Sequence, residues 1–444
     1  MNPEFQRNVW LELTPLRLIV LVAVLLFAFF AAAVSDGFAE PGTVARWLFD
    51  FIVIVWGTRN AARSVVGEIR ERTWDGQRLS SLRASTMMVG KLFGATVFNW
   101  VGGAICLAVV MAEDVNRGGG LTALADLVYL IALGLIAQAA SLLASLIAAG
   151  RRQGRSQFEI FLYQIVGIAA AVIAAMIADP SGWGYALFVR ADGIVWWGQT
   201  VPARGFLLLS LAAFAGWILL ADYRLMRLEL KLRNGPFVWL AFLVFVTLYA
   251  AGFDAWISHQ LPLADAAARR LYLAVLVCAV LAYANVLLEP KNRVFFRWLG
   301  SELGHARFGA TLSRLQCWMM SYAAALVLGL VLTLQLGLSG LAADQAMIGA
   351  GLGFMTRDMG LVVLMNVLAR RRGGDLLAIA VLILVYALMP SIVGGMQYGT
   401  GQALFLPRTT QPLWLSPVLA WLEAVAVWTL AVAKIALPEP AAKD

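Results

Sequence analysis

The chain has 444 residues, of which 61% are hydrophobic and 14% are charged, and its formal net charge is +8. A mean hydropathy of +0.80 and a pI near 9.6 exclude a large water-soluble protein and are typical of an integral membrane protein. In such a protein an excess of basic residues reflects orientation in the bilayer, so it does not indicate a nucleic-acid partner.

Apolar stretches of about 20 residues, each long enough to cross roughly 30 Å of hydrocarbon as a helix, recur along the chain. They predict an all-α polytopic membrane protein with about 12 transmembrane helices, at residues 16–34, 47–66, 88–112, 122–149, 158–178, 205–221, 237–253, 271–289, 315–338, 345–369, 375–395 and 414–435. If both termini are cytoplasmic, about 26 of the 34 Lys and Arg residues fall in inner segments or at inner span ends, and about seven fall in outer loops. This asymmetry favours cytoplasmic termini.

An amphipathic stretch precedes the first span. Phe5, Val9 and Leu13 share one helical face, while Glu4 and Arg7 lie on others. The pattern predicts an interfacial helix on the cytoplasmic leaflet. The residues from 223 to 234, which alternate leucine with basic residues, allow the same interpretation. Ordinary basic flanks that anchor the ends of spans are the alternative for both stretches.

The segment Gly67–Lys91 is a charged island between the second and third spans. It contains Glu68, Arg70, Glu71, Arg72, Asp75, Arg78, Arg83 and Lys91. So many charges cannot lie in hydrocarbon, so the segment must project into water. It is either a short helix–turn element that a partner can bind or a solvated loop that follows the positive-inside rule.

Two polar positions lie inside predicted spans. Arg357 and Asp358 fall in the tenth span, where a lone charge is costly. Adjacent helical residues do not face one another, so we expect each to pair with groups on other helices. The pair either lines a substrate pathway or forms a buried ion pair, unless the span begins later. Gln138 holds the corresponding place in the first half of the chain, and Glu423 in the last span is a weaker candidate.

Short segments recur in order along the chain at a nearly constant separation, which indicates an internal duplication. The matched pairs are Thr14-Pro15 with Gly235-Pro236, residues 150–154 with 371–374, and residues 186–190 with 403–408. They predict two six-helix transmembrane domains, residues 1–234 and 235–444. Six spans per half give both repeats the same orientation, related by an axis along the membrane normal.

The run Glu68-Ile69-Arg70-Glu71-Arg72-Thr73, followed by Gly90-Lys91-Leu92 at the start of the third span, carries a family resemblance. It resembles the permease subunits of ABC-2 type exporters, which typically have an E-R-E-x-G-T run and a G-K-L that opens the third of six helices. Arg72 stands where the family usually has glycine, and Arg83-Ala84-Ser85 replaces the usual T-P. The equivalent segment of the second half, residues 289–314, lacks both runs.

The resemblance implies that residues 67–91 form a coupling segment that docks on a separate cytoplasmic ABC ATPase, with residues 289–314 as a degenerate counterpart. The residues it assigns to coupling are Glu68, Arg70, Glu71, Arg72, Thr73, Trp74, Asp75, Gly90 and Lys91. Charged groups suit this role because they give an interface its orientation and specificity. Trp74 would add an aromatic anchor.

The chain has no recognisable chemistry of its own. Residues 304–311 have the glycine spacing of a phosphate loop but lack its lysine. Its two histidines, His259 and His305, do not have a metal-ligand spacing. We therefore expect no catalytic residue, metal or cofactor.

The function that we expect is that of the membrane subunit of an ATP-driven exporter in a bacterial cell inner membrane. Its partners would be one or two ATPase subunits, the lipid bilayer and an unidentified small-molecule or lipid substrate. One rival is an ion-coupled secondary transporter with two six-helix repeats, in which Arg357 and Asp358 carry coupling or substrate. A membrane enzyme or an assembly scaffold is the third hypothesis.

Overall fold

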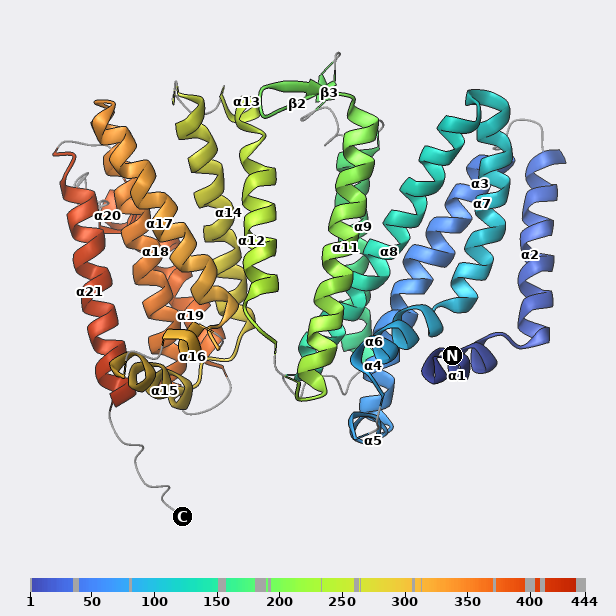
Figure 1. The fold of residues 1–444 in the computed structure, drawn as a ribbon, viewed down its shortest axis with the longest axis horizontal. Helices are drawn as coiled ribbons and strands as arrows, with labels where there is room; N and C mark the ends of the chain where they lie inside the picture. The colour runs from blue at the N-terminus through green and yellow to red at the C-terminus, as the bar shows by residue number, and fades with distance from the viewer. Residues whose placement is uncertain are drawn as a thin grey trace. The chain divides into compact units, whose positions relative to one another are not determined.

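The computed structural model describes residues 2–34, 40–79, 82–150, 157–179, 189–190, 193–232, 234–258, 263, 265–305, 308–312, 314–369, 373–395, 404–407 and 412–436. Within these ranges the chain is an α-helical polytopic membrane protein, as the sequence predicts, and ten helices are long and apolar enough to cross a membrane. It divides into two compact units, Met1–Ile194 with Thr200–Asn234, and Val195–Gln199 with Gly235–Asp444. Figure 1 shows the course of the chain.

The first unit begins with a short helix, α1, followed by the long helix α2. Its described helices are α1 (Pro3–Glu12), α2 (Pro15–Val34), α3 (Pro41–Phe49), the π-helix η1 (Asp50–Trp56), α4 (Gly57–Arg70), α5 (Trp74–Arg78), α6 (Ala84–Val89), the π-helix η2 (Gly90–Gly94), α7 (Val97–Gly118), α8 (Gly120–Gly150), α9 (Gln157–Ala178) and α11 (Ala203–Glu229). Figure 1 shows α1 and α5 at the same end of this unit, with α5 at its extremity.

Helix α8 is the centre of the first unit. In its most apolar stretch 72% of the residues are buried, against 11% in α2. A helix that is apolar all round must be covered on all sides, and α8 packs against α4, α7, α9 and α11. By contrast, α2 leaves most of its apolar surface exposed, as expected of a helix that faces lipid.

The second predicted span is a composite helix. It runs through α3, η1 and α4, from Pro41 to Arg70, and its backbone stays helical at both junctions. The wider π-helical turn of η1 leaves backbone carbonyls that need other donors. Side chains from neighbouring helices supply those donors, as described below.

The second unit is also built around one buried helix, α18. Its described helices are α12 (Phe237–Ala251), α13 (Asp254–Ile257), α14 (Ala266–Leu288), α15 (Arg293–Gly304), α16 (Phe308–Leu312), α17 (Cys317–Leu338), α18 (Ala342–Leu368), α19 (Gly374–Ile383), the π-helix η3 (Leu384–Leu388), α20 (Met389–Gly395) and α21 (Leu415–Ala436). In α18, as in α8, 72% of the most apolar stretch is buried. Gly353 permits close packing here, since a Cβ on it would lie 2.8 Å from the Ala420 Cβ of α21.

A small β-sheet departs from the expected all-α architecture. The strands β1 (Val189–Arg190), β2 (Gly193–Trp196) and β3 (Gln199–Val201) form a sheet in the order β1-β2-β3. Strands β1 and β2 are antiparallel, with Val189 opposite Ile194. The apolar span pattern of the sequence did not predict these strands. Parts of the recurring segments lie outside the described residues, namely 151–154, 186–188, 371–372, 403 and 408.

Candidate functional site: the charged segment and two polar clusters

Helix α4 ends in a tight turn that redirects the chain into α5. The Thr73 N–H donates to the Glu68 carbonyl at 2.9 Å and the Arg72 N–H donates to the Ile69 carbonyl at 3.3 Å, the two bonds of a Schellman motif. The motif requires a left-handed residue after the helix, and Arg72 has φ +59°. A side chain at this backbone angle costs roughly 1–2 kcal/mol. The turn therefore places arginine where glycine is favoured.

Lys91 is the centre of a buried charge cluster, which we call the Lys91 cluster: Glu4, Arg7, Glu68, Trp74 and Lys91. The Lys91 side chain is 1% exposed, and its ammonium pairs with Glu68 and with Glu4, the latter at 3.4 Å. The ammonium also lies 5.3 Å from the centre of the Trp74 ring. Arg7 contacts both carboxylates at 3.0 Å. One lysine of η2 thus joins α4 and α5 to α1, which lies far from them in the sequence.

Gly90 lets α1 approach closely enough to reach this lysine. A Cβ at Gly90 would lie 2.5 Å from Glu4 Cγ and 3.1 Å from the Phe5 backbone nitrogen. The Asn8 side-chain amide donates to the Gly90 carbonyl at 3.1 Å, and the Asn2 amide donates to the Thr86 carbonyl at 2.8 Å. The Gly-Lys pair therefore has a packing role and an electrostatic role in holding α1.

Helix α5 is tied to two longer helices. The Gln77 amide donates to Glu68 Oε1 on α4 at 2.6 Å. Arg78 Nε donates to the Glu229 carbonyl at the end of α11 at 2.9 Å. A force on α5 would therefore reach α4 and α11 through polar bonds, and α1 through the Lys91 cluster.

The structure separates the residues assigned to coupling into a buried set and an exposed set. Glu68, Gly90 and Lys91 are covered, whereas the exposed set is Arg70, Glu71, Arg72, Thr73 and Asp75. Leu79, just beyond α5, is 89% exposed. The interpretation of Trp74 as an anchor for a partner needs correction, because its side chain is 5% exposed. Trp74 packs inside the protein against Val65, Met87 and Leu92.

Gln138 lies in the interior of the first unit and supports η1. It is 0% exposed, and its amide nitrogen donates to the Val53 carbonyl at 3.0 Å. The Trp100 indole N–H donates to its amide oxygen at 2.9 Å. Asn99 and Gln164 supply donors to the neighbouring carbonyls of Ile52 and Val55, each at 2.8 Å. The geometry gives Gln138 a structural role in satisfying the π-helix.

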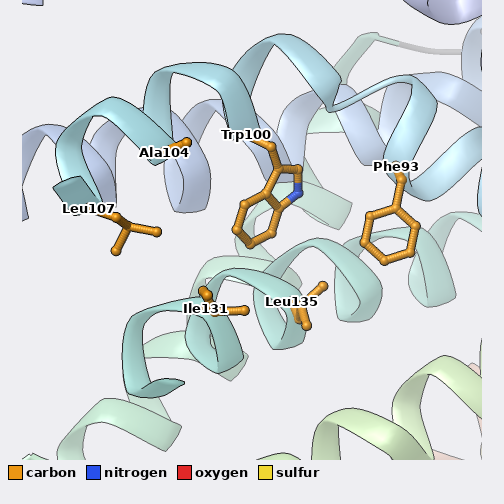
Figure 2. A pocket seen from close by; sticks show the side chains of 6 residues that line it. All are labelled: Phe93, Trp100, Ala104, Leu107, Ile131 and Leu135. Atoms are coloured by element: carbon orange, nitrogen blue, oxygen red, sulfur yellow. The ribbon is translucent and has the colours of Figure 1, made fainter. Parts of the chain in front are cut away.

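An apolar groove adjoins this polar interior. Its volume is about 360 Å³, and it is lined by Phe93, Trp100, Ala104, Leu107, Ile131 and Leu135. Figure 2 shows these side chains between two neighbouring helical segments, with the Trp100 ring between Ala104 and Phe93. Gln138 contributes nothing to the lining, because Trp100 stands between it and the groove.

Arg357 and Asp358 lie in a buried cluster of the second unit, the Arg357 cluster: Tyr283, Arg357, Asp358, Tyr386 and Glu423. Arg357 Nη1 donates to Glu423 Oε2 at 2.7 Å. Its Nε and Nη2 both donate to Asp358 Oδ1 at 3.1 Å. The hydroxyls of Tyr283 and Tyr386 donate to Asp358 Oδ2 at 2.7 and 2.6 Å. The cluster joins α14, α18, η3 and α21.

The Arg357 cluster corrects one expectation and extends another. Arg357 and Asp358 do contact each other, because the long arginine side chain folds back onto its neighbour. Each also pairs with other helices, as expected, and Glu423 joins the same cluster. Sequence reasoning missed Tyr283 and Tyr386. The signal was available, since a tyrosine hydroxyl buried in an apolar span needs a polar partner.

The second connector, between α14 and α17, has a different structure. Glu289 accepts from the backbone N–H groups of Cys317 at 3.0 Å and Trp318 at 3.5 Å. Lys291 pairs with Asp375 at 2.8 Å, at the start of α19. Burial raises the pKa of the Glu289 carboxyl. The two N–H groups and Lys291 favour the charged form and oppose this rise, but burial has the larger effect. This connector therefore ties helix ends together with its own charges.

Comparisons with known proteins do not place the chain in a family. No family model matches it, and neither a curated protein nor a solved structure does so. Within the described residues, His, Cys, Asp and Glu side chains form no group of three or more that could hold a metal ion.

Proposed function

We propose that this chain is the membrane subunit of an ABC-2 type exporter, powered by a separate cytoplasmic ATPase. The observation that carries the proposal is the exposed set, Arg70–Thr73 with Asp75, mounted on a rigidly held turn. Charged groups that are held in place offer a partner a specific surface. The Lys91 cluster and the bonds of α5 connect that surface to α1, α4 and α11, so docking could move several helices together.

The left-handed residue at the end of α4 supports the resemblance on physical grounds. Arg72 has φ +59°, and the family usually has glycine at the matching position. Glycine adopts this angle without steric cost. The family pattern therefore agrees with the backbone required by this turn, although the side chain differs.

The topology that we propose has twelve spans, both termini in the cytoplasm and two parallel six-helix repeats. The composite helix α3–η1–α4 and the fifteen-residue α12 would supplement the ten helices that are long enough by themselves. The arrangement of each unit around one buried helix, α8 or α18, supports the repeat. The membrane that we propose is a bacterial inner membrane.

The three candidate pathway residues are closed off in this structure. Gln138, Arg357 and Asp358 are all covered and hydrogen bonded. In the proposed exporter, the Arg357 cluster would have to open during the cycle in order to meet a substrate. The substrate is a small molecule or a lipid.

The test is charge reversal in the exposed set. The double variant Arg70→Glu with Glu71→Arg keeps the net charge but inverts the local pattern. We expect it to lose association with co-expressed candidate ATPase subunits, and to lose stimulation of their ATP hydrolysis. Arg17→Glu is the control, because Arg17 is exposed and pairs only locally with Glu12. Full association and stimulation in the double variant would contradict the proposal.

The buried charges of α18 favour an ion-coupled secondary transporter as the second candidate. Asp358 accepts hydrogen bonds from three residues, Arg357, Tyr283 and Tyr386, in a helix that spans the membrane, as an ion-coupling carboxylate could. Proteoliposomes without any ATPase separate the two hypotheses. Transport driven by an ion gradient, and abolished by Asp358→Asn, would support the secondary transporter and overturn the exporter.

A further inference from the structure

Helix α15 of the second connector is amphipathic, and its polar side faces the ends of other helices. Arg297 Nε donates to the Ile435 carbonyl at 2.8 Å, and Arg293 donates to the Val367 carbonyl. These carbonyls lie in the last turns of α21 and α18, where basic groups are favoured. Two apolar spans end at this level, so α15 lies at the depth of the membrane surface. Figure 1 shows α15 running across the end of α21.

Among the described residues, the side of α15 that carries Val294 stays largely uncovered. None of residues 293–304 is buried, and Val294 is 68% exposed. Val294 and Trp298 are four residues apart and therefore share a face, while Phe296 packs towards the core of the second unit. The last turn of this face carries Ser301 and Glu302, but its first two turns are apolar and aromatic. Apolar and aromatic side chains at the depth where spans end are the pattern of a helix lying in the bilayer interface.

The charges of the connector fit a lipid surface. Among its described charged residues the exposed ones are Arg297 and Arg314, both basic, whereas Lys291 is 1% exposed at its side chain and paired with Asp375. Arg314 lies 4.8 Å from the Trp298 ring centre, beside the apolar face. Anionic headgroups attract basic residues at this depth. The exposed set near α5 is different, because it carries both signs of charge and projects at the extremity of its unit.

We propose that α15 lies in the plane of the membrane, with Val294 and Trp298 in the boundary between acyl chains and anionic phospholipid headgroups. The second connector is then a membrane-surface anchor instead of a second ATPase-docking site. Through Arg293 and Arg297, it holds the ends of α18 and α21 at the surface. This inference does not depend on the chain being an ABC exporter.

Spin labels on two exposed apolar residues test the proposal in the full-length chain. Cys106, Cys278 and Cys317 are replaced by alanine, and a label is attached at Val294→Cys or, as the matched control, Leu79→Cys. The protein is placed in nanodiscs that contain anionic phospholipid. We expect the Val294 label to be more accessible to oxygen, which partitions into hydrocarbon, than to a water-soluble nickel chelate. The Leu79 label should show the reverse.

If the Val294→Cys variant does not fold, the label is attached at Trp298→Cys instead, one turn further along the same face. Preferential access of the chelate to both α15 positions would overturn the proposal. The proposal would also be overturned if the chelate reaches the α15 labels in the chain alone but no longer reaches them after a candidate ATPase subunit is added. That result would identify α15 as a protein-docking site. Oxygen preference that is unchanged by the ATPase supports the membrane anchor.

Discussion

Replacement of Lys91 by methionine should be among the most damaging single changes in the first unit. Methionine keeps much of the length and apolar character of the side chain but removes the charge. Glu4 and Glu68, whose side chains are only 5% and 13% exposed, then keep Arg7 as their cation. Removal of one partner from a buried ion pair costs about 3–5 kcal/mol. Because Arg7 still contacts both carboxylates, we expect the lower end, about 3 kcal/mol.

Thermal unfolding in detergent, followed by loss of monodisperse protein, measures this effect. A loss of about 3 kcal/mol corresponds to a fall in melting temperature of roughly 6–12 °C for a unit of this size. The control is Lys434→Met, since Lys434 is exposed and should cost no more than about 0.5 kcal/mol. Adding Glu68→Gln to Lys91→Met should restore part of the loss, because it removes a carboxylate left underpaired. Equal melting temperatures for Lys91→Met and Lys434→Met would refute the reasoning.

Three further predictions concern the same elements. Arg72→Gly should raise stability by about 1 kcal/mol, because glycine relieves the left-handed backbone; an unchanged or lower melting temperature would count against the assigned turn. Gly90→Leu should detach α1, since a branched side chain cannot fit against Glu4. A disulfide engineered between Asn2→Cys and Thr86→Cys tests this: we expect it to form with Gly90, because the Asn2 amide lies 2.8 Å from the Thr86 carbonyl, and to fail in the Gly90→Leu variant; formation in both would contradict the packing role of Gly90. Tyr386→Phe should cost about 1.5–3 kcal/mol, the value of a hydrogen bond to a charged group; a melting temperature equal to that of the parent would show that Asp358 does not depend on this hydroxyl.

The helical membrane class and most span positions could be predicted from the sequence. The length and polarity of an apolar run are local properties, and lipid leaves a chain few ways to satisfy its backbone other than by helices. Two local features were still missed. The π-helical turns η1, η2 and η3 have no simple periodic signature. The small β-sheet, formed by strands between Val189 and Val201, was also not predicted from the sequence.

The sequence by itself determined where the unusual charges are, at residues 67–91 and at Arg357-Asp358. Only the tertiary structure decided what those charges do. It buried Lys91 and Trp74, and it left Arg70, Glu71, Arg72, Thr73 and Asp75 exposed. It also joined Asp358 to two tyrosines. The reason is that these partners are distant in the chain, since Glu4 and Lys91 are 87 positions apart and Tyr283 and Asp358 are 75 positions apart. Local patterns show that a buried charge needs a partner, but only the packing of helices selects which one it finds.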